Sequence, residues 1–264
     1  MRELFEDVAG QSPLDPQEAA RQASRPVLRK RFYKDVGVGE TDGGFAISLD
    51  GKPIRTPSGR HVLIPSRALA EAVAAEWADQ KEALDPMTMP LTRLANSVVE
   101  GVVDRVADVS DDLARYFQSD LVFYRAGHPE ALVAREAEHW DPVLFWAADT
   151  LGAHFILSEG IVHVRQPDAA VQAAREALPE DPWSVAALHV ITTLTGSALL
   201  ALALAHGVRD ADQVWAAAHV DEDWNADQWG TDEEAAGRRA ARLRDFTAAV
   251  AVLQAVKAQA AQGS

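Results

Sequence analysis

Residues 43–66 read GGFAISLDGKPIRTPSGRHVLIPS and contain the strand and turn signals that decide the fold. Residues 45–49 alternate in polarity with a period of two, as in a half-buried strand. Asp50 and Gly51 are typical of a tight hairpin turn, because both central positions of a type I′ turn need a positive φ. Together with strands expected at 30–36, 53–56 and 61–64, this stretch predicts a small antiparallel meander.

A helix is expected directly after the meander. Ser66 is a suitable N-cap, and Leu69, Val73 and Trp77 recur every four residues on one helical stripe. Because a small sheet is marginally stable alone, this helix should cover its apolar face. The stiff segment DPMTMP at 85–90 then marks the end of a β-rich domain.

The rest of the chain is predicted to be mainly helical, which makes the fold class α+β. The expected organisation is a loosely attached arm at 1–28, a β-rich domain at 29–86 and a helical domain at 87–264 with a hairpin inserted near 153–165. Asp-Pro pairs at 85–86, 141–142 and 181–182 suit helix starts, with Asp as N-cap and Pro in the first turn. Helices are expected at 90–106, 110–119, 129–140, 142–151, 168–178, 182–206, 210–219 and 232–257.

The most hydrophobic stretch, residues 184–206, reads SVAALHVITTLTGSALLALALAH. Its length reaches the roughly 20 residues of a membrane span. It also contains His189 and Gly196 in its interior, and no cationic flank would fix its orientation. We therefore predict a buried helix of a globular core, which Gly207 ends, and no membrane insertion.

Composition excludes several classes of function. The 264 residues include no cysteine, which rules out disulfides, thiolate metal sites and cysteine nucleophiles. The formal net charge is −15, so nucleic acids and anionic membranes would be repelled. The acidic N-terminus has neither a positively charged start nor an apolar run, and it is not read as a secretory signal.

Motifs for enzyme chemistry are almost absent. The sequence has no phosphate-binding loop and no nucleophile elbow. Glu136 and His139 have the spacing of dimetal helical bundles, but such a site needs a second copy, which the sequence lacks. No cofactor, metal or catalytic residue is therefore predicted. A helical-bundle enzyme or metal-binding protein that uses Glu136 and His139, or the acids at 221–223, stays the alternative.

An acidic segment lies beside two tryptophans between two predicted helices. Asp221, Glu222 and Asp223 precede Trp224 and Trp229. One interpretation is a solvated acidic loop whose indoles lie in the core. Another is a recognition surface, because tryptophan offers large, stiff contact area and acids select a basic partner segment. Acid–base catalysis is a third, although no nucleophile neighbours the acids.

The ordered set of motifs resembles the ATP12 family, the assembly chaperones of the F1 part of ATP synthase. The resemblance spans most of residues 29–250, and the arm and the 153–165 region match poorly. The matching motifs are RFYK at 31–34, GGFxIxLDGKPxxTP at 43–57, PSxALA at 65–70, EWxxQ at 76–80, MPLTxL at 89–94, DLxxYR at 120–125, WDP at 140–142, TxxGS at 193–197, and DE through WG at 221–230.

The resemblance implies a non-enzymatic chaperone that binds the free F1 α subunit and prevents its aggregation until β subunits replace it. It also implies that the helical domain is an orthogonal bundle. The family's functional acid aligns with Glu222, or with Asp221 if the register shifts by one. We therefore expect Asp221, Glu222, Trp224 and Trp229 to contribute to the partner site. A monomeric bacterial member in the cytoplasm is expected, because the N-terminus lacks the character of a mitochondrial presequence. A scaffold for some other protein is a further alternative.

Overall fold

The computed structural model describes residues 28–263, and these fall into two compact units. The smaller unit comprises residues 28–32 and 80–85, and the larger one comprises residues 33–79 and 86–263. Nearly all of the predicted arm at 1–28 lies outside the described residues. The predicted domain boundary near residue 86 stays a prediction, because the two compact units do not correspond to the two predicted domains.

The smaller unit is held together by backbone hydrogen bonds between its two segments. Lys30 and Ala83 form an antiparallel bridge, and the Leu84 amide donates to the Arg29 carbonyl at 2.8 Å. Residues 30–32 were expected to begin the first strand of the meander. Instead, residues 29–31 pair with residues 82–84, and the first strand begins further along the chain, at Val36.

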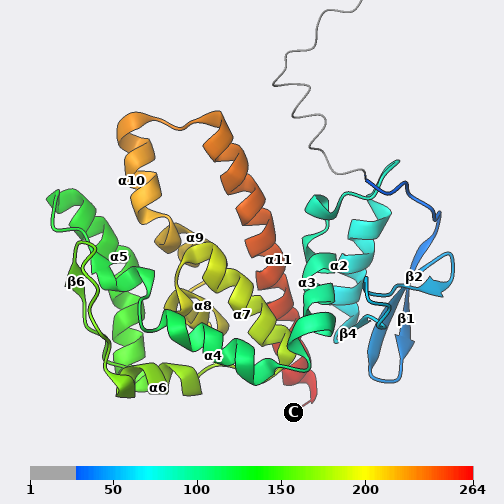
Figure 1. The fold of residues 1–264 in the computed structure, drawn as a ribbon, viewed down its shortest axis with the longest axis horizontal. Helices are drawn as coiled ribbons and strands as arrows, with labels where there is room; N and C mark the ends of the chain where they lie inside the picture. The colour runs from blue at the N-terminus through cyan, green and yellow to red at the C-terminus, as the bar shows by residue number, and fades with distance from the viewer. Residues whose placement is uncertain (1–27, 264) are drawn as a thin grey trace, which may run out of the picture. The chain divides into compact units, whose positions relative to one another are not determined.

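The meander is a four-stranded antiparallel arrangement around one central strand (Figure 1). β2 (Gly44–Leu49) pairs with β1 (Val36–Thr41) on one side, and with β3 (Lys52–Pro53) and β4 (Leu63–Ile64) on the other. Asp50 and Gly51 have φ values of 48° and 78°, which confirms the predicted turn. Ser66 caps α2 (Arg67–Ala78), which packs on β1, β2 and β4 as predicted.

The α2 helix also fixes the start of the helical part. Both carboxylate oxygens of Glu76 accept backbone amides at the beginning of α3 (Pro90–Ser97), from Leu91 at 2.7 Å and from Thr92 at 2.8 Å. The Thr92 hydroxyl donates to the same carboxylate at 2.7 Å. Glu76 therefore supplies the cap that α3 lacks at its own N-cap position, Met89.

The helices that follow form the larger part of the fold. After the short helix η1 (Pro86–Thr88) and α3 come η2 (Val98–Val102), α4 (Val106–Tyr116), η3 (Leu121–Phe123), α5 (Glu130–Trp146), η4 (Ala147–Leu151), α6 (Asp168–Glu176), α7 (Pro182–Thr195), α8 (Ala198–Ala205), α9 (Ala211–Ala218), α10 (Val220–Trp229) and α11 (Glu233–Gly263). With the sheet, they confirm the α+β class.

Two predicted features of the middle of the chain are wrong. Residues 153–165 form no hairpin, because β6 (Ser158–Glu159) pairs in parallel with β5 (Tyr124–Arg125) instead of with its own neighbours. The helix break at Asp141-Pro142 is also absent, and α5 runs through Pro142. Asp141 does not cap a helix here, because its carboxylate accepts a hydrogen bond from Arg125 at 2.7 Å.

The long apolar helix predicted at 182–206 is two helices, α7 and α8. Gly196 adopts φ 72°, and Ser197 starts α8 by accepting a hydrogen bond from the Leu200 amide at 3.0 Å. Asp181 caps α7 as predicted. Both helices lie in the core, where α7 contacts α4 and α11 while α8 contacts α5 and α9. Within residues 28–263, no helix combines the length and the apolarity that crossing a membrane requires.

Candidate partner-binding site

The predicted acidic segment forms the first turn of a helix, so the interpretation of it as a solvated acidic loop is wrong. Asp221, Glu222 and Asp223 begin α10, where negative side chains complement the positive end of the helix dipole. Gly230, with φ 84°, ends α10, and a short connection leads into α11. In Figure 1, α10 and the first half of α11 run in opposite directions, joined at the top of the view. We call residues 220–245 the α10–α11 arm.

A surface cavity of about 450 Å³ lies between the two helices of this arm. Glu222, Ala226 and Trp229 line it from α10, at the spacing i, i+4 and i+7 that shares one helix face. From α11 it is lined by small and basic side chains: Ala235, Ala236, Arg238, Arg239 and Arg242. Trp229 is 87% exposed at the rim, so its indole is available to a partner.

Arginines of α11 pair with the acids of α10. Arg239 binds Asp223 through both terminal nitrogens, with Nη2 lying 3.1 Å from Oδ2. This hydrogen bonding holds the pKa of Asp223 below its usual value. Glu222 is held more loosely, because its Oε1 lies 3.4 Å from Arg242 Nη1 and its side chain is 56% exposed. Of the two carboxylates, that of Glu222 is therefore the one more open to a partner.

His219 lies buried beneath Glu222, at the junction of α9 and α10. Its Nδ1 is 2.7 Å from the Trp215 carbonyl, which can only accept, so this nitrogen carries the hydrogen. Its Nε2 has no hydrogen-bond partner in the described structure and lies 3.9 Å from Glu222 Oε2. Burial lowers the pKa of His219, which favours the neutral ring.

Asp221 faces a different neighbour from Glu222. It lies against the buried carboxylate of Glu136 on α5, whose Oε2 accepts the Ala126 amide at 2.9 Å. Burial raises the pKa of Glu136, and the charge and hydrogen bonding of Asp221 raise it further. Asp221 therefore belongs to the contact between α5 and α10, outside the cavity.

The structure thus divides the four predicted partner residues. It brings Glu222 and Trp229 together at the α10–α11 cavity. Asp221 lies at the α5 contact, and Trp224 is half-buried and does not line the cavity. Sequence reasoning missed Arg238, Arg239 and Arg242. Their basic spacing was a signal, but its meaning depends on α11 folding back along α10.

The alternative metal site finds no support in the geometry. Glu136 is buried and occupied with the Ala126 amide, while the next residue of the motif, His139, is only half-buried and lines a different cavity with Asp212. Across residues 28–263, no group of three or more histidine and carboxylate side chains is placed to hold a metal ion.

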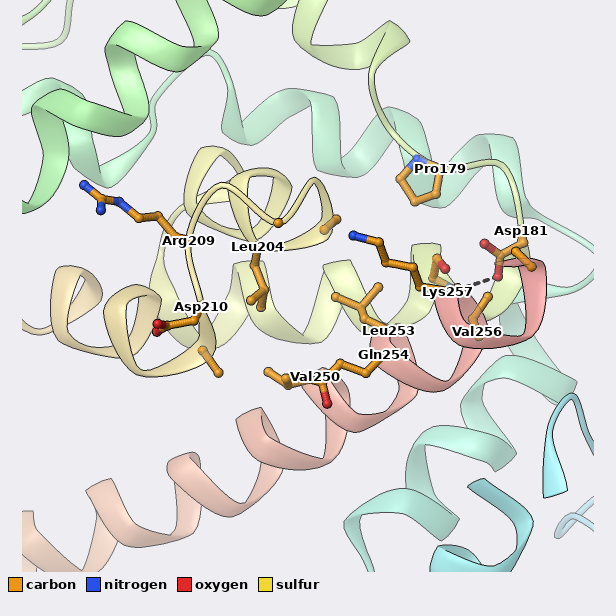
Figure 2. Close-up of a pocket in the computed structure, with 15 residues that line it drawn as sticks. Pro179, Asp181, Leu204, Arg209, Asp210, Val250, Leu253, Gln254, Val256 and Lys257 are labelled. Carbon is orange, nitrogen blue, oxygen red and sulfur yellow. Dashed lines mark hydrogen bonds between the residues drawn. The ribbon is translucent and has the colours of Figure 1, made fainter. Parts of the chain in front are cut away.

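A second cavity, of about 490 Å³, lies between the C-terminal half of α11 and the ends of α7, α8 and α9. Its lining is largely apolar and includes Leu204, Val250 and Leu253 (Figure 2). Figure 2 shows Lys257 reaching into this cavity, whereas Arg209 points away from the other side chains drawn. None of the four predicted partner residues lines it.

Comparison with known proteins gives this fold a family. The family model of the ATP12 chaperone protein matches residues 30–148. The structure of Atp12 from Paracoccus denitrificans is similar with a TM-score of 0.78 and 40% identity, over 86% of this chain and 97% of that one. The chain belongs to the ATP12 family of chaperone proteins.

Two further relatives extend the likeness. The Atu1473 protein of Agrobacterium tumefaciens has 49% identity and a TM-score of 0.83, over 95% of this chain and 94% of that one. The mitochondrial protein atp12 of Schizosaccharomyces pombe is 22% identical over 237 residues, which are 81% of this chain and 79% of the relative. ATP12 likeness therefore extends well beyond the segment that the family model matches.

In this member of the ATP12 family, several of the sequence motifs that resemble the family hold the fold together. Asp120, fully buried, accepts the Val122 amide at 3.3 Å and, near the start of α8, the Leu199 amide at 3.0 Å. The Leu121 amide donates to the Gly196 carbonyl at 3.2 Å. The DLxxYR and TxxGS motifs therefore meet in space, where they fix the break between α7 and α8.

Proposed function

We propose that this chain is an assembly chaperone for the F1 part of ATP synthase, which binds the free α subunit and prevents its aggregation until β subunits replace it. The observation that supports this most directly is the 40% identity to Paracoccus denitrificans Atp12 over 86% of the chain. A subunit without its neighbours exposes apolar interfaces and is prone to aggregate. A chaperone that shields such surfaces needs contact area but no chemistry of its own, and we propose that this one is not an enzyme.

Charge supports the same proposal. With a formal net charge of −15, each copy of the chain repels the others, which favours a soluble monomer. The same charge helps to keep a complex with an aggregation-prone client in solution. We further propose that it acts in the bacterial cytoplasm.

The direct test is light scattering of purified F1 α subunit diluted from denaturant, with and without equimolar amounts of this protein. We expect suppressed scattering and a complex that co-elutes in size-exclusion chromatography. Unchanged aggregation under conditions where this protein is folded would refute the proposal. Metal analysis and a ligand screen by thermal shift would then test the enzyme and metal-binding alternative.

Within this function, we propose that Asp221, Glu222, Trp224 and Trp229 contribute to the client site. The placement of Glu222 and Trp229 at one cavity favours these two as the direct contacts. Trp224 and Asp221 would act from the flanks of α10.

Replacing Glu222 tests this site. Glu222→Ala removes an exposed carboxylate, and Glu222→Lys places a cation opposite Arg242, so we expect weaker protection of the α subunit, most strongly with Lys. The melting temperature should change little, because the ion pair with Arg242 is exposed and long. The measurement is the concentration of chaperone that halves the scattering.

Glu233→Ala is the matched control, because Glu233 is an exposed carboxylate in the first turn of the next helix and does not line the cavity. Equal protection by the Glu222 variants and this control would show that Glu222 is outside the client site.

A further inference from the structure

A second surface outside the α10–α11 arm also has the character of a contact site. Ile156, Leu157, Ile161 and Val162 are all exposed within seven residues of one loop. Ile161 is 97% exposed and Val162 is 71% exposed. Single exposed aliphatic side chains are ordinary on protein surfaces, whereas a cluster of them marks an interaction site. We call Ile161 and Val162 the apolar tip.

The loop that presents this tip is firmly held at its base. The buried Gln166 side chain bonds the Ile156 backbone in both directions, accepting its amide at 2.8 Å and donating to its carbonyl at 2.9 Å. Phe155, which precedes Ile156 in the chain, stacks on the buried Phe123 with ring centres 4.6 Å apart. The base of the loop is therefore part of the core.

Further hydrogen bonds hold the turn beneath the tip. The Gly160 amide donates to the Arg125 carbonyl at 2.8 Å, in continuation of the parallel pairing of β5 and β6. The Ser158 hydroxyl donates to the Val162 carbonyl at 2.9 Å. The fold therefore orders the tip in advance, so that binding through it would lose little conformational entropy.

The charge of the loop, compared with that of the whole chain, narrows the choice of partner for the tip. Between residues 153 and 165 one glutamate and one arginine cancel, so the loop is neutral on a chain of net charge −15. Nucleic acid and anionic lipid would be repelled by the rest of the surface, and a second copy of the chain would be repelled in the same way. A neutral apolar protrusion instead complements an apolar pocket on a protein that is not strongly acidic.

We infer that the apolar tip docks into an apolar interface pocket of the client subunit, as a contact separate from the α10–α11 cavity. This inference rests on the proposed chaperone function, since the client is the protein whose apolar interface stands uncovered. The tip anchors the client by burial of aliphatic surface, and the arm adds polar contacts around Glu222.

The test is a double variant, Ile161→Ser with Val162→Ser, in the full chain. Because both side chains are exposed, we expect an unchanged circular dichroism spectrum and melting temperature. The concentration that halves aggregation of F1 α subunit should rise about tenfold or more, as for the loss of a central apolar contact. The conservative pair Ile161→Val with Val162→Ile should match the unaltered protein.

The control removes two exposed apolar side chains outside both the tip and the arm. It combines Val103→Ser with Phe145→Ser, at positions where the native side chains are 46% and 65% exposed. This control should protect the client as the unaltered protein does. If the tip variant also protects as well as the unaltered protein, the inference is overturned while the chaperone function stands. If the unaltered protein fails to protect the α subunit, the proposed function fails and the inference falls with it.

Light scattering coupled to size-exclusion chromatography of the chaperone alone completes the design. We expect a monomer for the unaltered protein and for the tip variant. A dimer that the double variant dissociates would mean that a second copy covers the tip, which overturns the assignment to the client.

Discussion

At the residue scale, buried carboxylates organise this fold by capping backbone amides far away in the sequence. Asp120 joins η3 to α8, and Glu76 joins α2 to α3. Burial raises the pKa of both groups, because low polarity disfavours the charged form. For Asp120 the pKa rises to about 6, even though the amides and Ser197 that bond it oppose the shift.

This shift makes Asp120 a source of pH-dependent stability. A folded pKa near 6 against 3.8 for the ordinary group means that the native state binds the proton more tightly than the unfolded chain. The contribution of Asp120 to the free energy of unfolding is therefore fully present below about pH 4 and is lost as the pH rises towards and through 6.

We accordingly predict that the unaltered protein loses stability relative to Asp120→Asn as the pH rises from 4 to 7. Asparagine cannot ionise, so the difference between the two proteins isolates this one group from the other carboxylates. Urea denaturation at several pH values across this window measures it. If the free energies of unfolding of the unaltered protein and of Asp120→Asn changed with pH in parallel, the native pKa of Asp120 would be close to its ordinary value.

Sequence periodicity predicted the apolar stripe of α2, and its members Leu69 and Val73 are buried. Trp140 of the WDP motif is buried and donates its Nε1 hydrogen to the Ala217 carbonyl at 2.7 Å. Trp77 is half-buried and packs edge-on against Tyr33, with ring centres 5.7 Å apart. The arginines of α11 were out of reach of such reasoning, because their partners are 16 and 20 residues away, across the bend at Gly230.

At the element scale, most local turn and cap signals were reliable, with Asp141 as the exception, and helix interiors were not. Asp50-Gly51, Ser66 and Asp181 act as predicted, since their roles depend on a few neighbouring residues. The break at Gly196 was hidden by the strong hydrophobicity around it. Conversely, the proline in α5 suggested a break that the packed helix overrides, despite the missing hydrogen bond.

The start of α3 gives a prediction at this scale. Glu76→Ala should lower the free energy of unfolding by about 2–4 kcal/mol, because it leaves the Leu91 and Thr92 amides without their charged acceptor. Chemical denaturation measures the loss. Glu71→Ala on the exposed face of α2 is the control and should change stability by less than about 0.5 kcal/mol. Equal effects of the two changes would contradict a capping role for Glu76.

At the scale of the larger unit, stability should be unevenly distributed between the core and the candidate site. None of the residues from 221 to 245 belongs to the buried core, whereas most of α7 and α8 does. The α10–α11 arm is held largely by ion pairs at partly exposed side chains, such as Asp223 with Arg239 and Asp227 with Arg135. Such pairs are weak and are screened by salt.

We therefore predict that backbone amides of α10 and of residues 236–245 exchange with solvent much faster than those of α7 and α8. Hydrogen exchange followed by mass spectrometry measures this, and raising the salt concentration should speed the exchange of the arm selectively. Binding of the client should slow it. Uniform protection across the four helices would contradict this distribution of stability.

The junction at His219 restricts how the chain length can vary near the site. One residue ends α9 and begins α10, so a single pair of dihedral angles, φ −120° and ψ 17°, sets the direction of α10. An inserted or deleted residue there would turn α10 by about 100° about its axis. Glu222 and Trp229 would then leave the face that meets α11. Homologous chains can therefore differ in sequence along α10, but an insertion or deletion at this junction would abolish the site.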